Sequence, residues 1–394
     1  MKIISKCEHF KIYGFLLLLI LIFSYCSNSE INHKEEETSN QDSLIIGHGY
    51  DFIRNGKIER AEFDSILTLS DIDTFDIPPV TQKLATGLKN QLKLLSYQKS
   101  IQEDYSGIQI KKRALRQTIK ILLSSQFDNS FGVKNKLNAY QIWGEDQKGN
   151  VHYTGYFTPI LKVKAKPDNE YKYPLYRYPK DWEGLLPTRA EIDGEKVLAG
   201  KKLEIAYAKS MLDIYFMQVQ GSGYVEFPNG KRKLLAHAGG NKHKYRSIGK
   251  YMVDNGYATP EYVSLKSIKS YFQKHPEKID SILFINPSYV FFAPVNNQPR
   301  GAGNVTLTPN HSIAIDKKVL PLGSCFLAKI PIIDDKRNFS HHEFRILLAQ
   351  DIGGAIKGTG HVDLYKGIGL KSQFEASALH HYGSLWLLLP KEKD

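Results

Sequence analysis

The chain has little cysteine and no long hydrophobic run. Its 394 residues include three cysteines, Cys7, Cys26 and Cys325, and two of them lie near the N-terminus, so disulfides cannot hold the rest of the chain together. The apolar run from Phe15 to Phe23 is about half of the ~20 residues that a membrane-spanning helix needs. Internal repeats are absent too, which excludes repeat architectures. The stability of the chain must therefore come from a buried core.

The composition that remains is that of a globular protein. Apolar residues make up 42% and charged residues 24% of the chain, which excludes disorder, collagen and coiled coil as its main class. The length predicts roughly two or three domains. Lys and Arg number 53 against 41 Asp and Glu, a formal net charge of +12. This surplus favours a polyanionic or carboxylate-bearing partner, without choosing among nucleic acid, an anionic membrane and an acidic polymer.

The N-terminal segment has the order of a secretory signal: lysines, then the apolar run, then Cys26 followed by polar residues. It resembles a bacterial lipoprotein signal, which implies a signal peptide over 1–25 and a lipid on Cys26. Tyr25 departs from that pattern, because such signals usually have a small residue before the cysteine. A cleaved signal without lipid and an uncleaved anchor are the alternatives. Residues 26–45 are polar and acidic, and we expect them to form a tether.

Several segments predict helices. Apolar residues recur at helical spacing in two early stretches, namely at Leu84, Leu88, Leu92 and Leu95, and at Leu115, Ile119, Leu122 and Leu123. The second stretch is basic, and we interpret its charges as a solvated face rather than an anion site. Ser247 is a candidate N-cap for a helix that ends at Asn255, and Ser264 for a helix that stops before Pro276. Residues 203–212 are also expected to be helical.

The later part of the chain predicts mostly strands. The apolar run 214–219 is expected to be a buried strand, and further short apolar segments bounded by turn residues follow. These are Ser288 to Ala293, Ser312 to Ile315, Ser324 to Ile330, Phe344 to Ala349 and Ser384 to Leu389.

Three aspartates stand at the ends of strand-like segments. Asp351 is followed by a glycine turn through Gly353, Gly354 and Lys357, and Asp363 stands on the return strand. A return strand could bring the two carboxylates close together, and neighbouring carboxylates push their pKa values apart, so that one can act as a general acid. Asp316 follows another strand. From spacing alone, all three could equally be turn and capping residues.

Other motifs carry less information. Ser222 lies in Gly-Ser-Gly and lacks the spacing of a serine hydrolase, and Gly353-Gly354 with Lys357 lacks the order of a phosphate loop. Lys357 is expected instead to lower the pKa of Asp351 by its charge. The pairs His341-His342 and His380-His381 have no metal-ligand spacing, and we interpret them as exposed polar positions. We expect neither a metal nor a cofactor.

Blocks of residues, in order along the chain, resemble the membrane-bound lytic murein transglycosylase A family. Asp316 with Pro321-Leu322-Gly323, the block from Asp351 to Gly358, and the block from Val362 to Tyr365 are similar to its C-terminal three-aspartate (3D) domain. Five upstream blocks match the same family. They are Tyr153 to Pro159, Arg189 to Ile192, Met217 to Tyr224, Tyr245 to Lys250 and Asn286 to Phe292.

The resemblance implies an α+β fold with two β domains and a glycan-binding groove where they meet. A double-psi β-barrel would be formed by 46–155, with N-terminal helices, and by 246–394, and a second β domain would be inserted over 156–245. The implied reaction cleaves the β-1,4 bond between N-acetylmuramic acid and N-acetylglucosamine in peptidoglycan and leaves a 1,6-anhydro end. The implied location is the periplasmic face of the outer membrane, through a lipid anchor.

The resemblance also assigns roles by position. Asp363 matches the catalytic acid, and Asp351 and Asp316 match aspartates that set its surroundings. By this resemblance, the segment between Asp351 and Asp363 is one residue longer than in the best-known member of the family. Substrate contacts are expected from amide, glycine, aromatic and basic positions. These are Tyr153, Tyr156, Gln218, Gln220, Gly221, Ser222, Gly223, Gly353, Gly354 and Lys357, and Trp182 is a further candidate for stacking on a sugar.

The expected partners are peptidoglycan glycan strands and the membrane, with no nucleic acid. We expect a monomer that could join complexes of cell-wall synthesis or lysis. Two other functions stay open at this point. One is a hydrolytic glycosidase on the same fold, which would need a second carboxylate to activate water. The other is a non-catalytic peptidoglycan-binding module in which the aspartates only hold the turns.

Overall fold

The computed structural model describes residues 67–101, 104–105, 108–125, 131–144, 148–259, 265–296, 298–354 and 356–391. The predicted signal peptide, Cys26 and the tether lie outside these residues, as does Ser264. Cys325 is the one cysteine within them, and it is a buried free thiol whose pKa is raised by burial. Among the described residues no helix is both long and apolar enough to cross a membrane.

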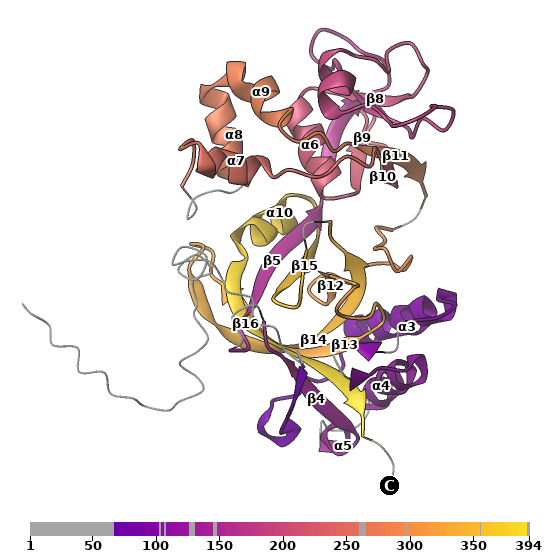
Figure 1. Cartoon of the computed structure of the whole chain (residues 1–394), viewed down its shortest axis with the longest axis vertical. Coiled ribbons are helices and arrows are strands. Elements are labelled where there is room, and N and C mark those ends of the chain that lie inside the picture. Colours follow the sequence, from indigo (N-terminus) through magenta and orange to yellow (C-terminus); the bar gives the residue numbers. More distant parts are fainter. Residues whose placement is uncertain are drawn as a thin grey trace, which may run out of the picture. The chain divides into compact units, whose positions relative to one another are not determined.

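A closed β-barrel forms the first part of the fold (Figure 1). Its strands, in the order in which they pair, are β5 (Val151–Thr158), β15 (His361–Ile368), β12 (Ser312–Ile315), β14 (Phe339–Ile352), β13 (Cys325–Ile333) and β16 (His380–Pro390). Pairing of β16 with β5 closes the ring, and β4 (Leu137–Ile142) and β1 (Leu67–Ser70) extend it from β16. The pairs β12–β14 and β15–β5 are parallel, and the other pairs in the ring are antiparallel.

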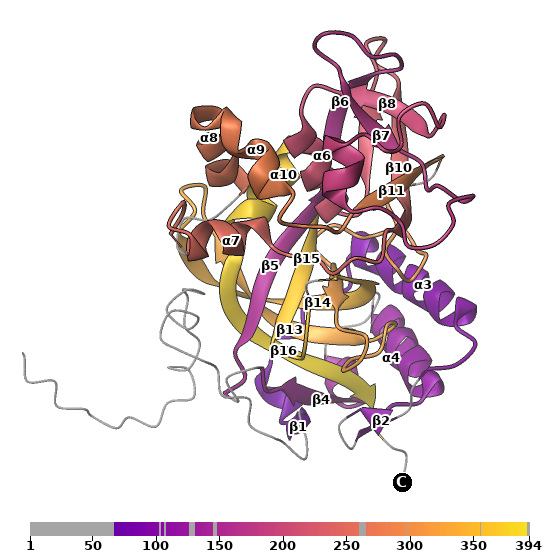
Figure 2. The same cartoon turned by 45° about the horizontal axis from the view of Figure 1, so that its top comes forward.

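Two helices pack against the barrel, α3 (Gln82–Tyr97) and α4 (Lys112–Ser124), and they lie side by side in both views (Figures 1 and 2). Leu84, Leu88 and Leu95 are buried in the main core, which confirms the predicted apolar face of α3. Gln91 on the same helix is also fully buried, and its Nε2 donates to Ser324 O at 2.7 Å. The lysines and arginines of α4 are exposed or half-buried, as predicted for a solvated face.

A second sheet has the strand order β11-β10-β9-β6-β8-β7, and most of its strands are labelled in Figure 2. The strands are β6 (Ile160–Lys164), β7 (Tyr173–Tyr176), β8 (Glu204–Ala208), β9 (Gly223–Glu226), β10 (Arg232–Gly240) and β11 (Val290–Val295). The prediction of a helix over 203–212 and a strand over 214–219 is wrong: 204–208 is β8, and Met211–Val219 is helix α6. Ser210 caps α6 by accepting from Asp213 N, and the helix is apolar on most sides because it is buried.

Three further helices follow β10. They are α7 (Ile248–Asp254), α8 (Leu265–Lys274) and α9 (Ile279–Leu283). Ser247 caps α7 by accepting from Lys250 N, and Gly256 follows with φ +72°, so the predicted helix and both of its ends are confirmed. Several further elements are short. They are the 3-10 helices Ile72–Thr74 and Pro276–Lys278, the π-helix Ala190–Gly194, α5 (Phe131–Lys134), β2 (Asp104–Tyr105) and β3 (Ile108–Gln109).

The boundary of the second domain differs from the sequence prediction. We expected the inserted domain to span 156–245, with the chain then returning to the barrel. Instead β11 pairs along its whole length with β10, and α7 to α9 lie between these two strands in the sequence. The second sheet therefore ends at Val295, about fifty residues later than expected. Helices α7 to α9 have no strand-like sequence pattern. The pattern of this region therefore did not indicate that the chain returns to the barrel only after β11.

Helix α10 (Gly369–Ala378) connects β15 to β16 and crosses β5 closely. The crossing requires a glycine: a Cβ at Gly155 would lie 2.6 Å from Ala376 Cα. The tight approach explains why the motif Tyr153-Thr154-Gly155-Tyr156 has glycine at its third position.

Candidate active site

Adjacent strands β5 and β15 present a row of polar side chains on one face. Their register pairs His361 with His152, Asp363 with Thr154, and Tyr365 with Tyr156. Because side chains alternate along a strand, all six lie on the same face. The residues between them point the other way, and Tyr153, Val362 and Leu364 are buried in the main core. The alternation thus separates the barrel core from a polar face that holds Asp363.

Asp363 is half-buried on this face and accepts one side-chain hydrogen bond, from the Thr154 hydroxyl to Oδ1 at 2.9 Å. The pKa of Asp363 is raised from its ordinary 3.8 to about 7, mainly by burial; the Thr154 hydrogen bond opposes this rise, and the negative charge of Asp351 adds to it. The carboxyl group can therefore keep its proton at neutral pH, as a general acid must.

Asp351 lies on β14, and β12 separates it from Asp363. Ala314 on β12 pairs with Asp351 on one side and with Asp363 on the other, after a register shift in the β12–β14 pair. The return strand that carries Asp363 therefore pairs with β12, and β12 pairs in turn with β14. Two strand spacings put their Cα atoms roughly 10 Å apart, so they interact through charge across the Ala314 side chain.

Three donors reach the Asp351 carboxylate. Tyr156 OH donates to Oδ2 at 3.0 Å, and Ala302 N and Ile352 N donate to Oδ1 at 2.8 and 2.9 Å. Burial nevertheless raises the pKa of Asp351, and the three hydrogen bonds oppose that rise. The expectation that Lys357 lowers this pKa is wrong: Lys357 is exposed, and the groups that act on Asp351 are these neutral donors.

The donor Ala302 comes from the loop Arg300–Asn304, which the sequence reading did not single out. Gly301 permits its close approach, because a Cβ there would lie 2.5 Å from Gln350 O and 2.9 Å from Asp351 Cβ. Gly303 N also donates to Gln350 O at 3.0 Å. This loop therefore rests directly on the end of β14 and holds the Asp351 carboxylate in place.

Asp316 binds backbone groups of two loops. Its Oδ1 accepts from Lys318 N at 3.0 Å, and its Oδ2 accepts from Gly358 N at 3.1 Å. Asp316 thus ties the turn that precedes β15 to the end of β12. Asp316 therefore helps to fix the start of the strand that carries Asp363.

A small apolar cluster lies next to the two acidic groups, since Ala314 pairs with both of them and Tyr156 donates to Asp351. It consists of Tyr156, Leu307, Ala314, Ile356 and Tyr365. The rings of Tyr156 and Tyr365 are 5.2 Å apart, and the Tyr365 hydroxyl bonds to the Thr158 hydroxyl at 2.9 Å. Burial raises the pKa of Tyr156 well above its ordinary 10, so this phenol stays neutral and donates to Asp351. The cluster provides the apolar surroundings that raise the pKa of both aspartates.

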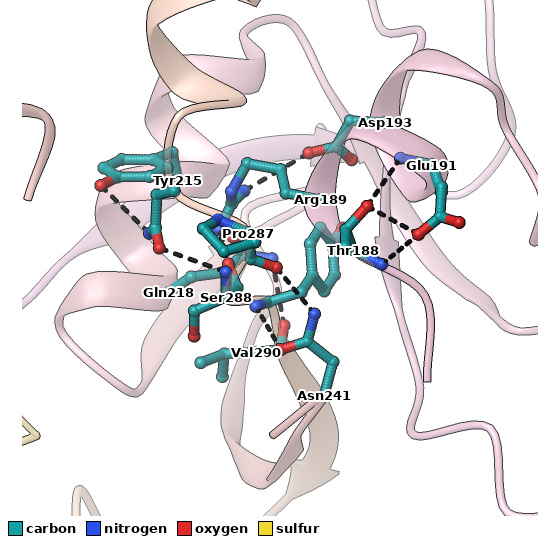
Figure 3. A network of polar contacts seen from close by, with 12 residues as sticks. Thr188, Arg189, Glu191, Asp193, Tyr215, Gln218, Asn241, Pro287, Ser288 and Val290 are labelled. Atoms are coloured by element: carbon teal, nitrogen blue, oxygen red, sulfur yellow. Dashed lines mark hydrogen bonds and ion pairs between the residues drawn. The ribbon is translucent and has the colours of Figure 1, made fainter. Parts of the chain in front are cut away.

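The two glutamines of the predicted substrate-binding segment, Gln218 and Gln220, have different surroundings. Gln218 is buried, and its Nε2 donates to Val290 O at 3.0 Å within the polar network that also holds Arg189 and Asn241 (Figure 3). The prediction that Gln218 contacts substrate is therefore wrong. Gln220 is half-buried, and its Oε1 accepts from Phe157 N at 2.9 Å, next to Tyr156.

The rest of this segment varies in exposure. Gly221 has φ +79°, and no atom lies within 4 Å of a Cβ placed on it, so the space beside it is open. Ser222 is half-buried, and Gly223 is buried against Met217. Beyond Asp351, Gly354 and Lys357 are exposed, whereas Gly353 is half-buried against Ile356.

Two predicted aromatic contacts behave differently. Tyr153 is fully buried, and its hydroxyl donates to Ser384 O at 2.8 Å. Its predicted role in substrate binding is wrong, because alternation along β5 points it away from Asp363. Trp182 is half-buried, packs with the cluster around Tyr176 and Leu186, and lies under the Lys201 ammonium group.

The interpretation of His380 and His381 as exposed positions is also wrong. His381 is 8% exposed, and His380 Nδ1 lies 2.7 Å from His152 Nε2. Among the described residues no group of three or more His, Cys, Asp or Glu could hold a metal ion. His341 is exposed, as expected, and His342 is half-buried.

Sequence reasoning missed Thr154, His361 and the Ala302 amide. Thr154 and His361 could have been found from the alternation of polar residues along both strands. The two sequences are His152-Tyr-Thr154-Gly-Tyr156 and His361-Val-Asp363-Leu-Tyr365. A polar face of this kind, opposite buried positions, can be read from period two alone. The Ala302 amide gave no signal beyond its flanking glycines.

Comparisons with known proteins agree with this arrangement. Residues 152–293 match the family described as "MltA specific insert domain", and residues 311–389 match the "3D domain". The chain is 40% identical over 256 residues to the membrane-bound lytic murein transglycosylase A of Escherichia coli K12, an alignment that covers 64% of this chain and 69% of that protein. The chain belongs to the membrane-bound lytic murein transglycosylase A family. Its insert and 3D segments meet at the β5–β15 pair that carries Thr154 and Asp363.

Solved structures of the family have the same fold. E. coli MltA with bound chitohexaose matches with a TM-score of 0.70 at 30% identity, covering 85% of this chain and 97% of that one. A membrane-bound lytic murein transglycosylase from Agrobacterium tumefaciens matches with a TM-score of 0.71 at 25% identity, covering 82% and 98%. The predicted class, an α+β chain with a β-barrel and a second β domain, is confirmed.

Proposed function

We propose that this lytic murein transglycosylase cleaves the β-1,4 bond between N-acetylmuramic acid and N-acetylglucosamine, with Asp363 as its acid and then its base. The observation that supports this most is the setting of Asp363. It is a half-buried carboxyl group on a polar strand face, with one hydroxyl donor and with its pKa raised to about 7 by burial. A group that holds its proton near neutral pH can give that proton up and take one back.

The unequal hydrogen bonding of the two aspartates assigns their roles. Hydrogen bonds from donors favour the ionised form of a carboxyl group, and Asp351 receives three such bonds against one for Asp363. The first negative charge of the pair therefore resides on Asp351, and the proton stays on Asp363. The charge on Asp351 also favours the positive charge that develops on the sugar in the transition state.

A single acid/base group is enough for the reaction. Asp363 protonates the bridging oxygen as the bond from that oxygen to C1 of the muramic acid breaks, which leaves an oxocarbenium-like sugar. The C6 hydroxyl of the same sugar then attacks C1, and the Asp363 carboxylate accepts its proton. The products are a free hydroxyl on N-acetylglucosamine and a 1,6-anhydro end, and no water is consumed. Asp363 returns to its protonated state.

We place the glycan along the face that carries Asp363, toward the Gln220–Gly223 turn. Gln220 is bonded to Phe157 N, so this turn lies beside the end of β5, where Tyr156 precedes Phe157. Open space beside Gly221 and the half-buried Ser222 leave backbone and hydroxyl groups that can bond to sugar hydroxyl and acetamide groups. The binding of chitohexaose by the E. coli relative supports a site for several sugar rings.

The cellular setting is a further part of the proposal. The relatives are named as membrane-bound, and the N-terminal pattern supports attachment through a lipid on Cys26, at the periplasmic face of the outer membrane. The positive net charge fits peptidoglycan, whose stem peptides carry free carboxylates. We propose a monomer that acts on glycan strands and could join other cell-wall enzymes.

Digestion of purified sacculi tests the role of Asp363. We expect Asp363→Asn to lower the rate of muropeptide release by at least about 100-fold, the range that a general acid contributes, while the folded structure is retained. Asp335→Asn is the matched control, because Asp335 is exposed, and its rate should equal that of the wild type. Release at a near-normal rate by a folded Asp363→Asn protein would reject this role.

A further inference from the structure

Three histidines continue the polar face beyond Thr154, and the mechanism above does not use them. Thr154 Oγ1 lies 2.9 Å from His361 Nε2 as well as 2.9 Å from Asp363 Oδ1. The His361 ring is stacked on the His152 ring with centroids 4.9 Å apart, and His152 Nε2 lies 2.7 Å from His380 Nδ1. The catalytic carboxyl group is thus connected through one hydroxyl to a stack of imidazole rings.

The Thr154 hydroxyl has one proton for two neighbours, so its orientation depends on His361. If His361 Nε2 carries a hydrogen, it donates to the Thr154 oxygen, and the hydroxyl must donate to Asp363 Oδ1. If Nε2 is bare, the hydroxyl can turn to His361 and leave Oδ1. The first arrangement suits both charge states of Asp363, because Oδ1 accepts in both and the acid proton resides on Oδ2.

We propose that His361 is a positioning residue for Asp363, acting through Thr154. Its Nε2–H orients the Thr154 hydroxyl toward Oδ1, so that the transferred proton leaves from and returns to Oδ2. His152 and His380 hold the His361 ring in the required plane. This inference rests on the proposed role of Asp363 and adds to it the group that decides which carboxyl oxygen carries the proton.

The surroundings keep His361 in its neutral form. Burial lowers the pKa of His361 to about 4, and burial likewise lowers the pKa of His152 and His380, each with a smaller effect of neighbouring histidines. Two other titratable groups interact with Asp363 through charge, namely the Asp351 carboxylate and the Tyr156 phenol. The charged group that the neighbouring helix α10 contributes to β15 is Glu375, and it is paired with Lys366 at 3.8 Å. Imidazoles that are neutral near pH 7 can act as hydrogen-bond donors of fixed tautomer.

Kinetics of three variants test the proposal. His361→Phe keeps a ring for stacking but removes the donor, whereas the side-chain amide of His361→Gln can still donate to Thr154. We expect His361→Phe to lower kcat about tenfold with little change in KM, as for the loss of one hydrogen bond. We expect the alkaline limb of its kcat profile to move to higher pH, because the Asp363 carboxylate loses an enforced donor. His361→Gln should restore most of kcat and most of the position of the alkaline limb. His341→Phe, at an exposed histidine, should match the wild type in both.

A double variant separates action through Thr154 from any other effect. Thr154→Val combined with His361→Phe should be no slower than Thr154→Val alone, because His361 has nothing left to orient. Losses of kcat that add up in the double variant would overturn the proposal. An unchanged kcat in His361→Phe would also overturn it. So would equal losses of kcat in His361→Phe and His361→Gln together with an alkaline limb that does not move. If the Phe variant fails to fold, as judged by its melting curve, His361→Asn replaces it, since its amide is too short to reach Thr154.

The same digests keep this inference apart from the proposed function. Anhydro ends from the wild type together with an unaffected His361→Phe variant would reject only the role of His361. Digests of the wild type without anhydro ends would reject the proposed function itself.

Discussion

Asp363 and Asp351 differ in the hydrogen bonds that they receive. Because of this difference, Asp363 is the protonated acid and Asp351 is the ionised carboxylate. Both lie beside the apolar side chains of Tyr156, Ala314 and Tyr365, so burial raises the pKa of both. Backbone N–H groups of the Gly301-containing loop and of its own strand donate to Asp351, whereas the donor to Asp363 is the Thr154 hydroxyl. One carboxyl group keeps a proton while its neighbour carries a charge, and the roles follow from the local donors.

The raised pKa of Asp363 predicts a pH-dependent effect on stability. Its folded-state pKa of about 7 lies above the ordinary 3.8, so its contribution to stability is complete below about pH 4 and is lost as the pH rises through 7. Asp363→Asn should therefore be more stable than the wild type at pH 8, by on the order of 1–3 kcal/mol, and equal to it near pH 4. Thermal unfolding at both pH values measures this. A difference that is the same at both would contradict the assigned pKa.

At the scale of elements, backbone contacts of loops and helices hold the catalytic strands in register. Three such contacts involve Gly301, whose loop packs against the end of β14, Asp316, which binds the turn before β15, and Gly155, which lets α10 pack closely on β5. Each contact is made by segments that local periodicity does not describe. The register of Asp351, Ala314 and Asp363 is therefore a property of several elements together.

Gly301→Ala tests the loop contact. A Cβ at this position would meet Gln350 O at 2.5 Å, so the loop must move and withdraw Ala302 N from Asp351. We expect a loss of stability of about 1–3 kcal/mol and a kcat about tenfold lower. Gly240→Ala is the matched control, since the nearest atom to its added Cβ is 3.4 Å away. Unchanged melting temperature and kcat in Gly301→Ala would show that the loop does not hold Asp351.

Individual elements could be predicted where the sequence pattern is strong. The leucines of α3 and the capped helix α7 were predicted because apolar spacing and caps act locally. The prediction took β8 for a helix and α6 for a strand. A buried helix such as α6 is apolar on most sides, so its helical periodicity of apolar residues cannot be seen. Tyr153 and Gln218 were assigned to the substrate because a motif gives residue types without the direction of the side chains.

At the scale of the whole molecule, the site depends on strands that are far apart in sequence. Strand β5 precedes the second sheet and pairs with β15 and β16 near the C-terminus, which places Thr154 beside Asp363 and His152 beside His380. Spacing alone suggested that a return strand could bring Asp351 and Asp363 close together, but it gave no sign that β12 lies between their strands. No local pattern encodes such pairings, so the resemblance to a family carried the prediction of the barrel and of Asp363.

Digestion of sacculi in water enriched in oxygen-18 tests the central claim most directly. If Asp363 returns the proton while the C6 hydroxyl closes on C1, mass spectrometry should find 1,6-anhydro ends that contain no oxygen-18. A hydrolytic reaction would give reducing muramic acid ends, each heavier by one water and labelled at C1. Labelled reducing ends as the primary product would contradict the account.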